Sequence, residues 1–271
     1  MKHENLGPII AVANQKGGVG KTTTSINLSA SLSAMDYRVL LVDLDPQGNS
    51  TTGLGIDKGA IHGSTYDLLT AETGLGEIVV CSDFEGLLVA PSDVELTAAE
   101  IELIHASRRE FRLHDAFSAY HGEPFDYVVI DCPPALNLLT INALTAADRV
   151  LITLQTEFLA LEGVSQILET LRRVRKRLNP QLTVDGILLT MMDRRNKIAQ
   201  QVEREVRDYF GAQVYQTVIP RNVRLAEAPS FGVPVLQHDV RSTGAQAYLQ
   251  AAAELVRREA AMQQVEEEVT V

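Results

Sequence analysis

Residues 9–24 read IIAVANQKGGVGKTTT, an apolar run followed by a glycine-rich turn and by residues that can open a helix. The run at 9–13 predicts a buried strand, and the pattern after the turn predicts a helix over 22–35. Glycines in such a turn let backbone N–H groups converge on phosphate oxygens, and the N-terminus of the helix adds the positive end of its dipole. The order of strand, turn and helix therefore predicts a phosphate-binding loop.

Two side chains of this loop fit a nucleoside triphosphate. Lys21 can reach the β- and γ-phosphates, and the Thr22 hydroxyl can bind Mg²⁺. The loop departs from the general pattern G-x-x-x-x-G-K-[ST] at its first position, where Gln15 replaces glycine, and it carries an additional lysine, Lys16. The guanine-reading pattern N-K-x-D is not met, because Ala199 stands at its last position. ATP is therefore the favoured nucleotide.

Outward from the loop, short apolar runs alternate with amphipathic stretches. The runs are continuously apolar, which is typical of strands covered on both faces. Their alternation with helices predicts a doubly wound α/β fold, with a mostly parallel sheet flanked by helices. Strands are predicted at 9–13, 38–43, 87–90, 125–131, 149–154, 184–190 and 213–218, and helices at 22–35, 162–178, 199–210 and 245–258.

Length and composition favour one domain in a cytoplasmic protein. The chain has 271 residues, a net charge of −11 and 45% hydrophobic residues, values that are ordinary for a globular protein. No apolar stretch approaches the ~20 residues needed to span a bilayer, and we expect no membrane partner. We expect a single domain over 1–262 and an acidic, flexible tail over 263–271. The segment 48–63 is rich in Gly, Ser and Thr and is predicted to form surface loops.

Three aspartates stand at the ends of predicted strands. Asp43 and Asp45 lie in LLVDLDPQGN (40–49), and Asp131 lies in DYVVIDCPP (126–134). Because α/β sheets bind ligands at the carboxyl ends of their strands, we expect these carboxylates beside the nucleotide. A carboxylate at Asp45 can hold the attacking water, and phosphoryl transfer requires mainly such positioning and charge neutralisation. A purely structural polar turn is the alternative.

These stretches, together with VIPRNVRLAEAPSFGVP (218–234), resemble the ParA/Soj partition ATPases. That family belongs to the MinD/ParA group of P-loop ATPases, whose deviant Walker A motif is matched by KGGVGKT (16–22). The resemblance runs across nearly the whole chain. It implies slow, Mg²⁺-dependent ATP hydrolysis by an ATP-dependent homodimer that binds double-stranded DNA without sequence preference. It also implies a ParB-type partner that stimulates hydrolysis, and a nucleoid-associated role in chromosome or plasmid segregation.

The resemblance further implies roles at matching positions. Lys16 would reach the phosphates held by a second copy of the chain, and Thr23 would touch the α-phosphate. Asp43 would support the metal or the lysines, and the adenine would lie near 220–222 through backbone contacts. The implied catalytic set is Lys16, Lys21 and Asp45, the Mg²⁺ set is Thr22, Asp45 and Asp131, and the nucleotide-binding set is Lys16, Gly17, Gly18, Val19, Gly20, Lys21, Thr22, Thr23, Asp43, Asp131, Pro220 and Asn222.

Basic residues cluster despite the acidic total. Five lie within 172–177 on one predicted helix, and others lie at 194–197 and 221–224. By resemblance, Arg195 and Arg224 would contact DNA, whereas the 172–177 run alone is more typical of a solvated helix face. Contacts to phosphates would carry affinity without sequence information and would depend strongly on salt.

Three alternative classes remain. A MinD-like, membrane-associated division-site ATPase needs a C-terminal amphipathic helix with basic and bulky apolar faces, but the end AMQQVEEEVTV (261–271) is acidic. A reductase subunit of the nitrogenase iron-protein type would use two cysteines per chain. Cys81 and Cys132 are present, without a cluster-binding loop. The third class is a nucleotide-gated scaffold without activity. The presence of both Lys21 and Asp45 disfavours it, because these residues support at least slow hydrolysis.

Overall fold

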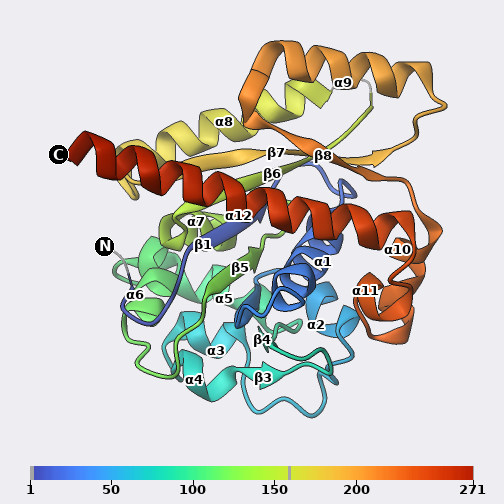
Figure 1. Cartoon of the computed structure of the whole chain (residues 1–271). Coiled ribbons are helices and arrows are strands. Elements are labelled where there is room, and N and C mark those ends of the chain that lie inside the picture. Colours follow the sequence, from blue (N-terminus) through green and yellow to red (C-terminus); the bar gives the residue numbers. More distant parts are fainter. Residues whose placement is uncertain (1–2, 158–159, 271) are drawn as a thin grey trace.

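The apolar runs of the sequence form the strands of one sheet in the computed structural model, which describes residues 3–157 and 160–270 (Figure 1). The strand order is β3-β4-β2-β5-β1-β6-β7-β8. All neighbours are parallel except β3, which is antiparallel to β4. The strands are β1 (Ile9–Ala13), β2 (Val39–Asp43), β3 (Val80–Cys81), β4 (Leu87–Ala90), β5 (Tyr127–Asp131), β6 (Arg149–Gln155), β7 (Thr183–Met192) and β8 (Val214–Pro220).

Helices cover both faces of the sheet, and α12 crosses one of them along its length (Figure 1). Helices α1, α10, α11 and α12 share one apolar cluster with the sheet, and α3 to α9 share the other. The helices are α1 (Lys21–Ser33), α2 (Asn49–Gly53), α3 (Thr65–Thr70), α4 (Leu75–Ile78), α5 (Leu96–Glu102), α6 (Arg112–Ser118), α7 (Leu138–Ala146), α8 (Ala160–Arg177), α9 (Lys197–Phe210), α10 (Val223–Glu227), α11 (Val235–His238) and α12 (Thr243–Thr270), with short 3-10 turns η1 (Leu103–His105), η2 (Arg109–Phe111), η3 (Gly211–Gln213) and η4 (Ala228–Phe231).

Strand β1 occupies the middle of the sheet, between β5 and β6. Each of its residues is at most 1% exposed, because helices cover it on both faces. Its carboxyl end delivers the chain directly into the glycine-rich turn and α1. The predicted α/β class and each of the seven predicted strands are confirmed, with ends shifted by a few residues. Strand β3 was not predicted, because a strand of two residues is too short to show a hydrophobic pattern.

Two predictions about polar segments differ from the structure. The segment 48–63 was expected to form surface loops, but its first part is helix α2, in which Ser50 and Thr51 are fully buried. Their hydroxyls bind strand-end carboxylates, so a polar composition here does not mean exposure. The helix predicted over 245–258 continues as α12 to Thr270, across most of the expected tail. Ala, Gln and Glu, which dominate this stretch, are strong helix formers, and Val271 lies outside the described residues.

None of the helices in the described part of the chain combines the length and the apolarity that crossing a bilayer requires.

Candidate nucleotide site

The phosphate loop lies between β1 and α1, at the carboxyl edge of the sheet. Gly18 and Gly20 have φ angles of 73° and 84°, in the left-handed region that glycine adopts without a steric penalty. The Val19 side chain is buried, and its carbonyl accepts the Thr190 hydroxyl of β7 at 2.9 Å. A β-carbon placed on Gly17 would meet no atom within 4 Å. The loop is therefore anchored from one side and open on the other.

Helix α1 begins at Lys21 without a side-chain cap. The first N–H groups of a helix have no partner within the helix, and together with the helix dipole they form a site for anions. Thr22 and Thr23 lie half-buried in this first turn. The two threonines thus stand where a phosphate held by the loop would meet the helix.

The two lysines of the loop differ in environment. Lys21 is buried, and its Nζ donates to the Lys16 carbonyl at 3.0 Å. Burial lowers the pKa of the Lys21 ammonium, and the carboxylates of Asp131 and Asp45 oppose this shift. The Lys16 side chain is 54% exposed and pairs with Glu157 at 3.1 Å. Lys21 therefore points into its own site, whereas Lys16 lies at the open side of the loop.

Asp131 closes β5 beside α1 and is fully buried. One oxygen accepts the Ser25 hydroxyl at 3.0 Å, and the other accepts the Ser50 hydroxyl at 2.7 Å. The Thr22 hydroxyl also donates to this carboxyl. Burial raises the pKa of Asp131, since the charged form loses its hydration. Asp131, Thr22 and Lys21 therefore lie together at the phosphate loop.

Asp43 ends β2 and is fully buried. One carboxylate oxygen accepts the Asp45 amide at 3.1 Å, and the other accepts both the amide and the hydroxyl of Thr51 at 2.8 Å. Burial raises the pKa of Asp43, and the nearby Asp131 charge adds to the shift. Both oxygens of Asp43 are thus engaged by protein donors, as those of Asp131 are, and these bonds hold the turn that carries Asp45.

The residues present fit Mg²⁺, which prefers oxygen ligands and keeps several waters. Hydroxyl oxygen from Thr22 and carboxylate oxygen from Asp131 meet at the phosphate loop, and Asp45, 8% exposed, lies on the neighbouring strand end. Within 3–157 and 160–270, no three His, Cys, Asp or Glu side chains are grouped to hold a metal on their own. A metal bound largely by phosphates and water needs no such group.

The segment expected at the adenine begins where β8 ends, at Pro220. Asn222 is the N-cap of α10, because its side-chain oxygen accepts the Arg224 amide at 2.8 Å. Its amide nitrogen donates to the Thr243 hydroxyl at 2.8 Å. Both polar atoms of the Asn222 side chain are thus engaged by the protein, and the contacts of this segment with adenine stay a prediction.

Arg195 and Arg224 follow the carboxyl ends of β7 and β8, at the same edge as the phosphate loop. Each is paired with a local carboxylate: Arg195 with both oxygens of Asp193 at 3.0 Å, and Arg224 with Glu227 at 2.8 Å. The basic run 172–177 ends α8, whose 18 residues span about 27 Å. Since α8 returns the chain from β6 to the start of β7, this run lies at the opposite edge (Figure 1).

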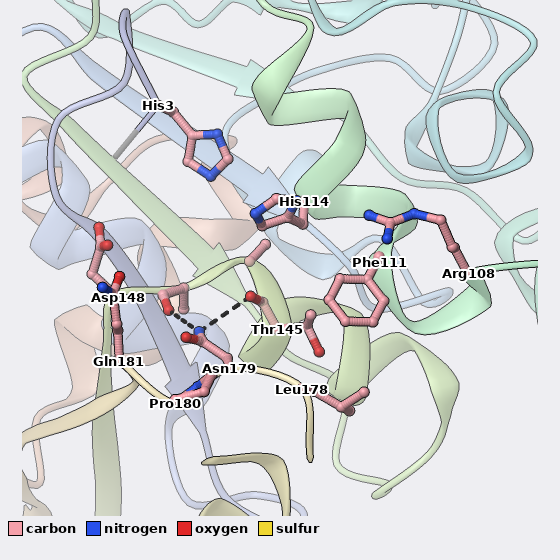
Figure 2. Close-up of a pocket in the computed structure, with 12 residues that line it drawn as sticks. His3, Arg108, Phe111, His114, Thr145, Asp148, Leu178, Asn179, Pro180 and Gln181 are labelled. Carbon is pink, nitrogen blue, oxygen red and sulfur yellow. Dashed lines mark hydrogen bonds between the residues drawn. The ribbon is translucent and has the colours of Figure 1, made fainter. Parts of the chain in front are cut away.

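A separate pocket of about 390 Å³ also lies at that opposite edge (Figure 2). Asp148 precedes β6 and Gln181 precedes β7, so part of its wall lies at the amino ends of strands, and the rest comes from α6, η2 and the end of α7. His3 and His114 face one another there, with ring centroids 5.1 Å apart. No predicted site residue lines this pocket, which is therefore distinct from the nucleotide site.

Sequence reasoning missed the polar residues that bond to the side chains or backbone of the strand-end aspartates, or to Lys16. They are Ser25, Ser50, Thr51, Ser92 and Glu157. Serine and threonine in these contexts are typical of helices and loops, so no signal in one sequence separates them from ordinary surface residues.

A phosphate loop after a central parallel strand, with a buried carboxylate at the end of the adjacent strand, defines a P-loop nucleoside triphosphatase. A family model described as an AAA domain matches residues 7–184. The chain is 53% identical over 252 residues to the chromosome partitioning protein ParA of Caulobacter vibrioides, covering 93% of this chain and 94% of that protein. It is also 53% identical over 250 residues to the sporulation initiation inhibitor protein Soj of Bacillus subtilis, covering 92% and 98%. The chain belongs to the ParA/Soj family of partition ATPases.

A solved structure agrees with the nucleotide site. Cobyrinic acid a,c-diamide synthase of Mycobacterium smegmatis, crystallised with an ATP analogue and magnesium, matches with a TM-score of 0.81 at 39% identity. The match covers 93% of this chain and 95% of that one. The predicted resemblance and the predicted pairing of ATP with Mg²⁺ are thereby confirmed at the level of the family.

The iron–sulfur alternative does not fit the positions of the cysteines. Cys81 lies on β3 and Cys132 directly follows β5, three strand spacings or about 14 Å across the sheet. Cys81 is exposed and Cys132 is buried, and burial raises the pKa of the Cys132 thiol. A buried, protonated thiol is a poor ligand for a cluster.

Proposed function

We propose that this chain uses ATP hydrolysis as a slow switch in DNA partition. The ATP-bound form pairs with a second copy and binds double-stranded DNA without sequence preference. Hydrolysis, stimulated by a ParB-type protein, releases it. The proposed location is the cytoplasm, on the nucleoid. The observation that supports the proposal is the placement of the second loop lysine, Lys16, whose side chain is 54% exposed and contacts Glu157 rather than its own phosphate loop, so that it is accessible to a second copy.

The proposed chemistry assigns one task to each group. The loop amides, the N-terminus of α1 and Lys21 bind the phosphates. Thr22 and Asp131 would hold Mg²⁺, which would neutralise phosphate charge. Asp45 orients the attacking water, and Lys16 adds its charge to the nucleotide of the second copy. Little covalent chemistry is required, since phosphoryl transfer depends mainly on position and charge.

Dimer formation is tested by Gly17→Val. The valine β-carbon meets no atom of its own chain within 4 Å, so the variant should fold and bind ATP. Branched methyl groups on the open side of the loop should obstruct a second subunit. We expect ATP affinity within about threefold of wild type and loss of the ATP-dependent dimer in light scattering.

The control for this prediction is Gly76→Val. Gly76 lies on α4, where an added β-carbon would make an ordinary contact of 3.7 Å with Tyr120. This variant should dimerise as wild type does. A Gly17→Val protein that forms normal ATP-dependent dimers would contradict the proposed packing of two phosphate loops.

DNA binding is tested by Arg195→Glu combined with Arg224→Glu. The carboxylates that pair with these arginines do not prevent a role in DNA binding, because exposed ion pairs contribute little and phosphates can replace them. We expect ATP-dependent affinity for DNA to fall more than about tenfold and the salt dependence to flatten, since two phosphate contacts are lost. Anisotropy of labelled DNA over a salt series measures both.

The matched control reverses two charges at the opposite edge, in Arg172→Glu combined with Arg175→Glu. Net charge changes equally, so a general electrostatic effect would weaken both variants alike. Equal losses would mean that the proposed surface is misplaced. The same comparison tests whether the basic end of α8 contacts DNA.

A further inference from the structure

The backbone on both sides of Asp45 is fixed by a closed circuit of buried hydrogen bonds. The Asp45 amide donates to Asp43 at 3.1 Å, and the Thr51 hydroxyl donates to the other oxygen of Asp43 at 2.8 Å. The Ser92 amide donates to the Thr51 hydroxyl at 2.9 Å. The Ser92 hydroxyl then closes the circuit by donating to the Asp45 carbonyl at 2.9 Å.

The circuit joins three elements that are distant in the sequence. Asp43 ends β2, Thr51 lies on α2, and Ser92 follows β4 by two residues. Asp43, Thr51 and Ser92 are 0% exposed, and Asp45 is 8% exposed. Water therefore cannot replace any of these bonds, and a lost donor or acceptor would leave a buried polar group unpaired.

The orientation of the Asp45 side chain is set by this backbone. One carboxylate oxygen accepts the Gln47 amide at 3.0 Å, which fixes its rotation within the turn. Both peptide groups of Asp45 are held by the circuit, one through Asp43 and one through Ser92. The second carboxylate oxygen is thereby presented in one defined position at the carboxyl edge of the sheet.

We propose that Ser92 and Thr51 are positioning residues for the Asp45 carboxylate in ATP hydrolysis. The inference rests on the proposed role of Asp45 in orienting the attacking water. The hydroxyls of Ser92 and Thr51 are engaged by the turn that carries Asp45, not by the phosphate loop. They act through Asp45, because misplacing a reacting group by about 1 Å can cost on the order of a hundredfold in rate.

The experiment measures single-turnover and steady-state hydrolysis by Ser92→Ala and Thr51→Val. We expect kcat to fall about tenfold or more in each, with ATP affinity and KM close to wild type. Thr51→Ser keeps the hydroxyl and should retain kcat. If Ser92 and Thr51 served only overall stability, their loss would not lower kcat while leaving KM unchanged. In that case Thr51→Val and Thr51→Ser would also have the same kcat at a temperature where each variant is folded.

The matched control is Ser31→Ala. Ser31 is equally buried on α1, and its hydroxyl donates to the Asn27 carbonyl at 2.6 Å, outside the circuit. It should lose stability without losing kcat. A comparable loss of kcat in Ser31→Ala, or a raised KM with unchanged kcat in Ser92→Ala, would overturn the inference.

An Asp45→Ala background separates this inference from the proposed function. If Ser92 acts only through Asp45, then adding Ser92→Ala to Asp45→Ala leaves the residual rate unchanged. A further loss in the double variant would show that Ser92 acts elsewhere. If Asp45→Ala itself turns over at the wild-type rate, the proposed role of Asp45 fails, and the inference fails with it. If Asp45→Ala is slow while Ser92→Ala is not, only the inference fails.

Discussion

Asp45→Ala should bind ATP as wild type does and hydrolyse it about 10²- to 10⁴-fold more slowly, the range for loss of a positioned acid–base group. The carboxylate follows β2 by two residues, at the same edge of the sheet as the phosphate loop, and its removal leaves the loop, Lys21 and Thr22 intact. The phosphate cradle should therefore survive while the attacking water loses its orientation. Phosphate release and binding of a fluorescent ATP analogue measure the two effects separately.

The slow turnover of Asp45→Ala has a consequence for DNA. If hydrolysis ends the DNA-bound state, Asp45→Ala should remain on DNA with ATP far longer than wild type does. Asp83→Ala, an exposed aspartate between β3 and β4, is a suitable control and should behave as wild type. Rapid release of Asp45→Ala from DNA in ATP would separate hydrolysis from release and contradict the switch.

The central part of the fold could be predicted from the sequence because its signals are local. Strand β1 and the loop after it combine a fully apolar run, glycines at left-handed positions and a lysine at fixed spacing. Each of these has a physical requirement that few other residues meet. Asp131 could be placed for the same reason, since a carboxylate that ends an apolar run must emerge at the carboxyl edge of a parallel sheet.

The environment of the carboxylates could not be predicted, because it depends on contacts between distant segments. Thr51 and Ser92 are 41 residues apart, and Ser25 and Asp131 are 106 apart. The sequence alone does not distinguish a serine that is exposed to water from one that takes part in a buried hydrogen-bond circuit. Helix α2 was missed for this reason: its polar residues are stabilised by carboxylates from other strands rather than by helix propensity.

Among changes in the loop, Lys16→Gln should most completely abolish dimer formation and ATP hydrolysis while leaving ATP binding intact. The Lys16 side chain is half-exposed and contacts Glu157 rather than its own phosphate cradle. Its loss should leave ATP binding by the monomer within a few-fold of wild type. If Lys16 supplies charge to the nucleotide of a second copy, dimer formation and hydrolysis should both fall, with the rate reduced about 10²-fold or more, as for other electrostatic groups in transition states.

Lys21→Ala provides the contrast, because Lys21 is buried and directed into its own site. It should lose nucleotide binding altogether, and dimerisation with it. Glu157→Gln removes the present partner of Lys16 and should leave dimerisation intact or strengthen it, since a surface ion pair of this kind costs little to break. If Lys16→Gln instead weakens ATP binding by the monomer as severely as Lys21→Ala does, both lysines serve one subunit. The open side of the phosphate loop would then have no role in joining two copies.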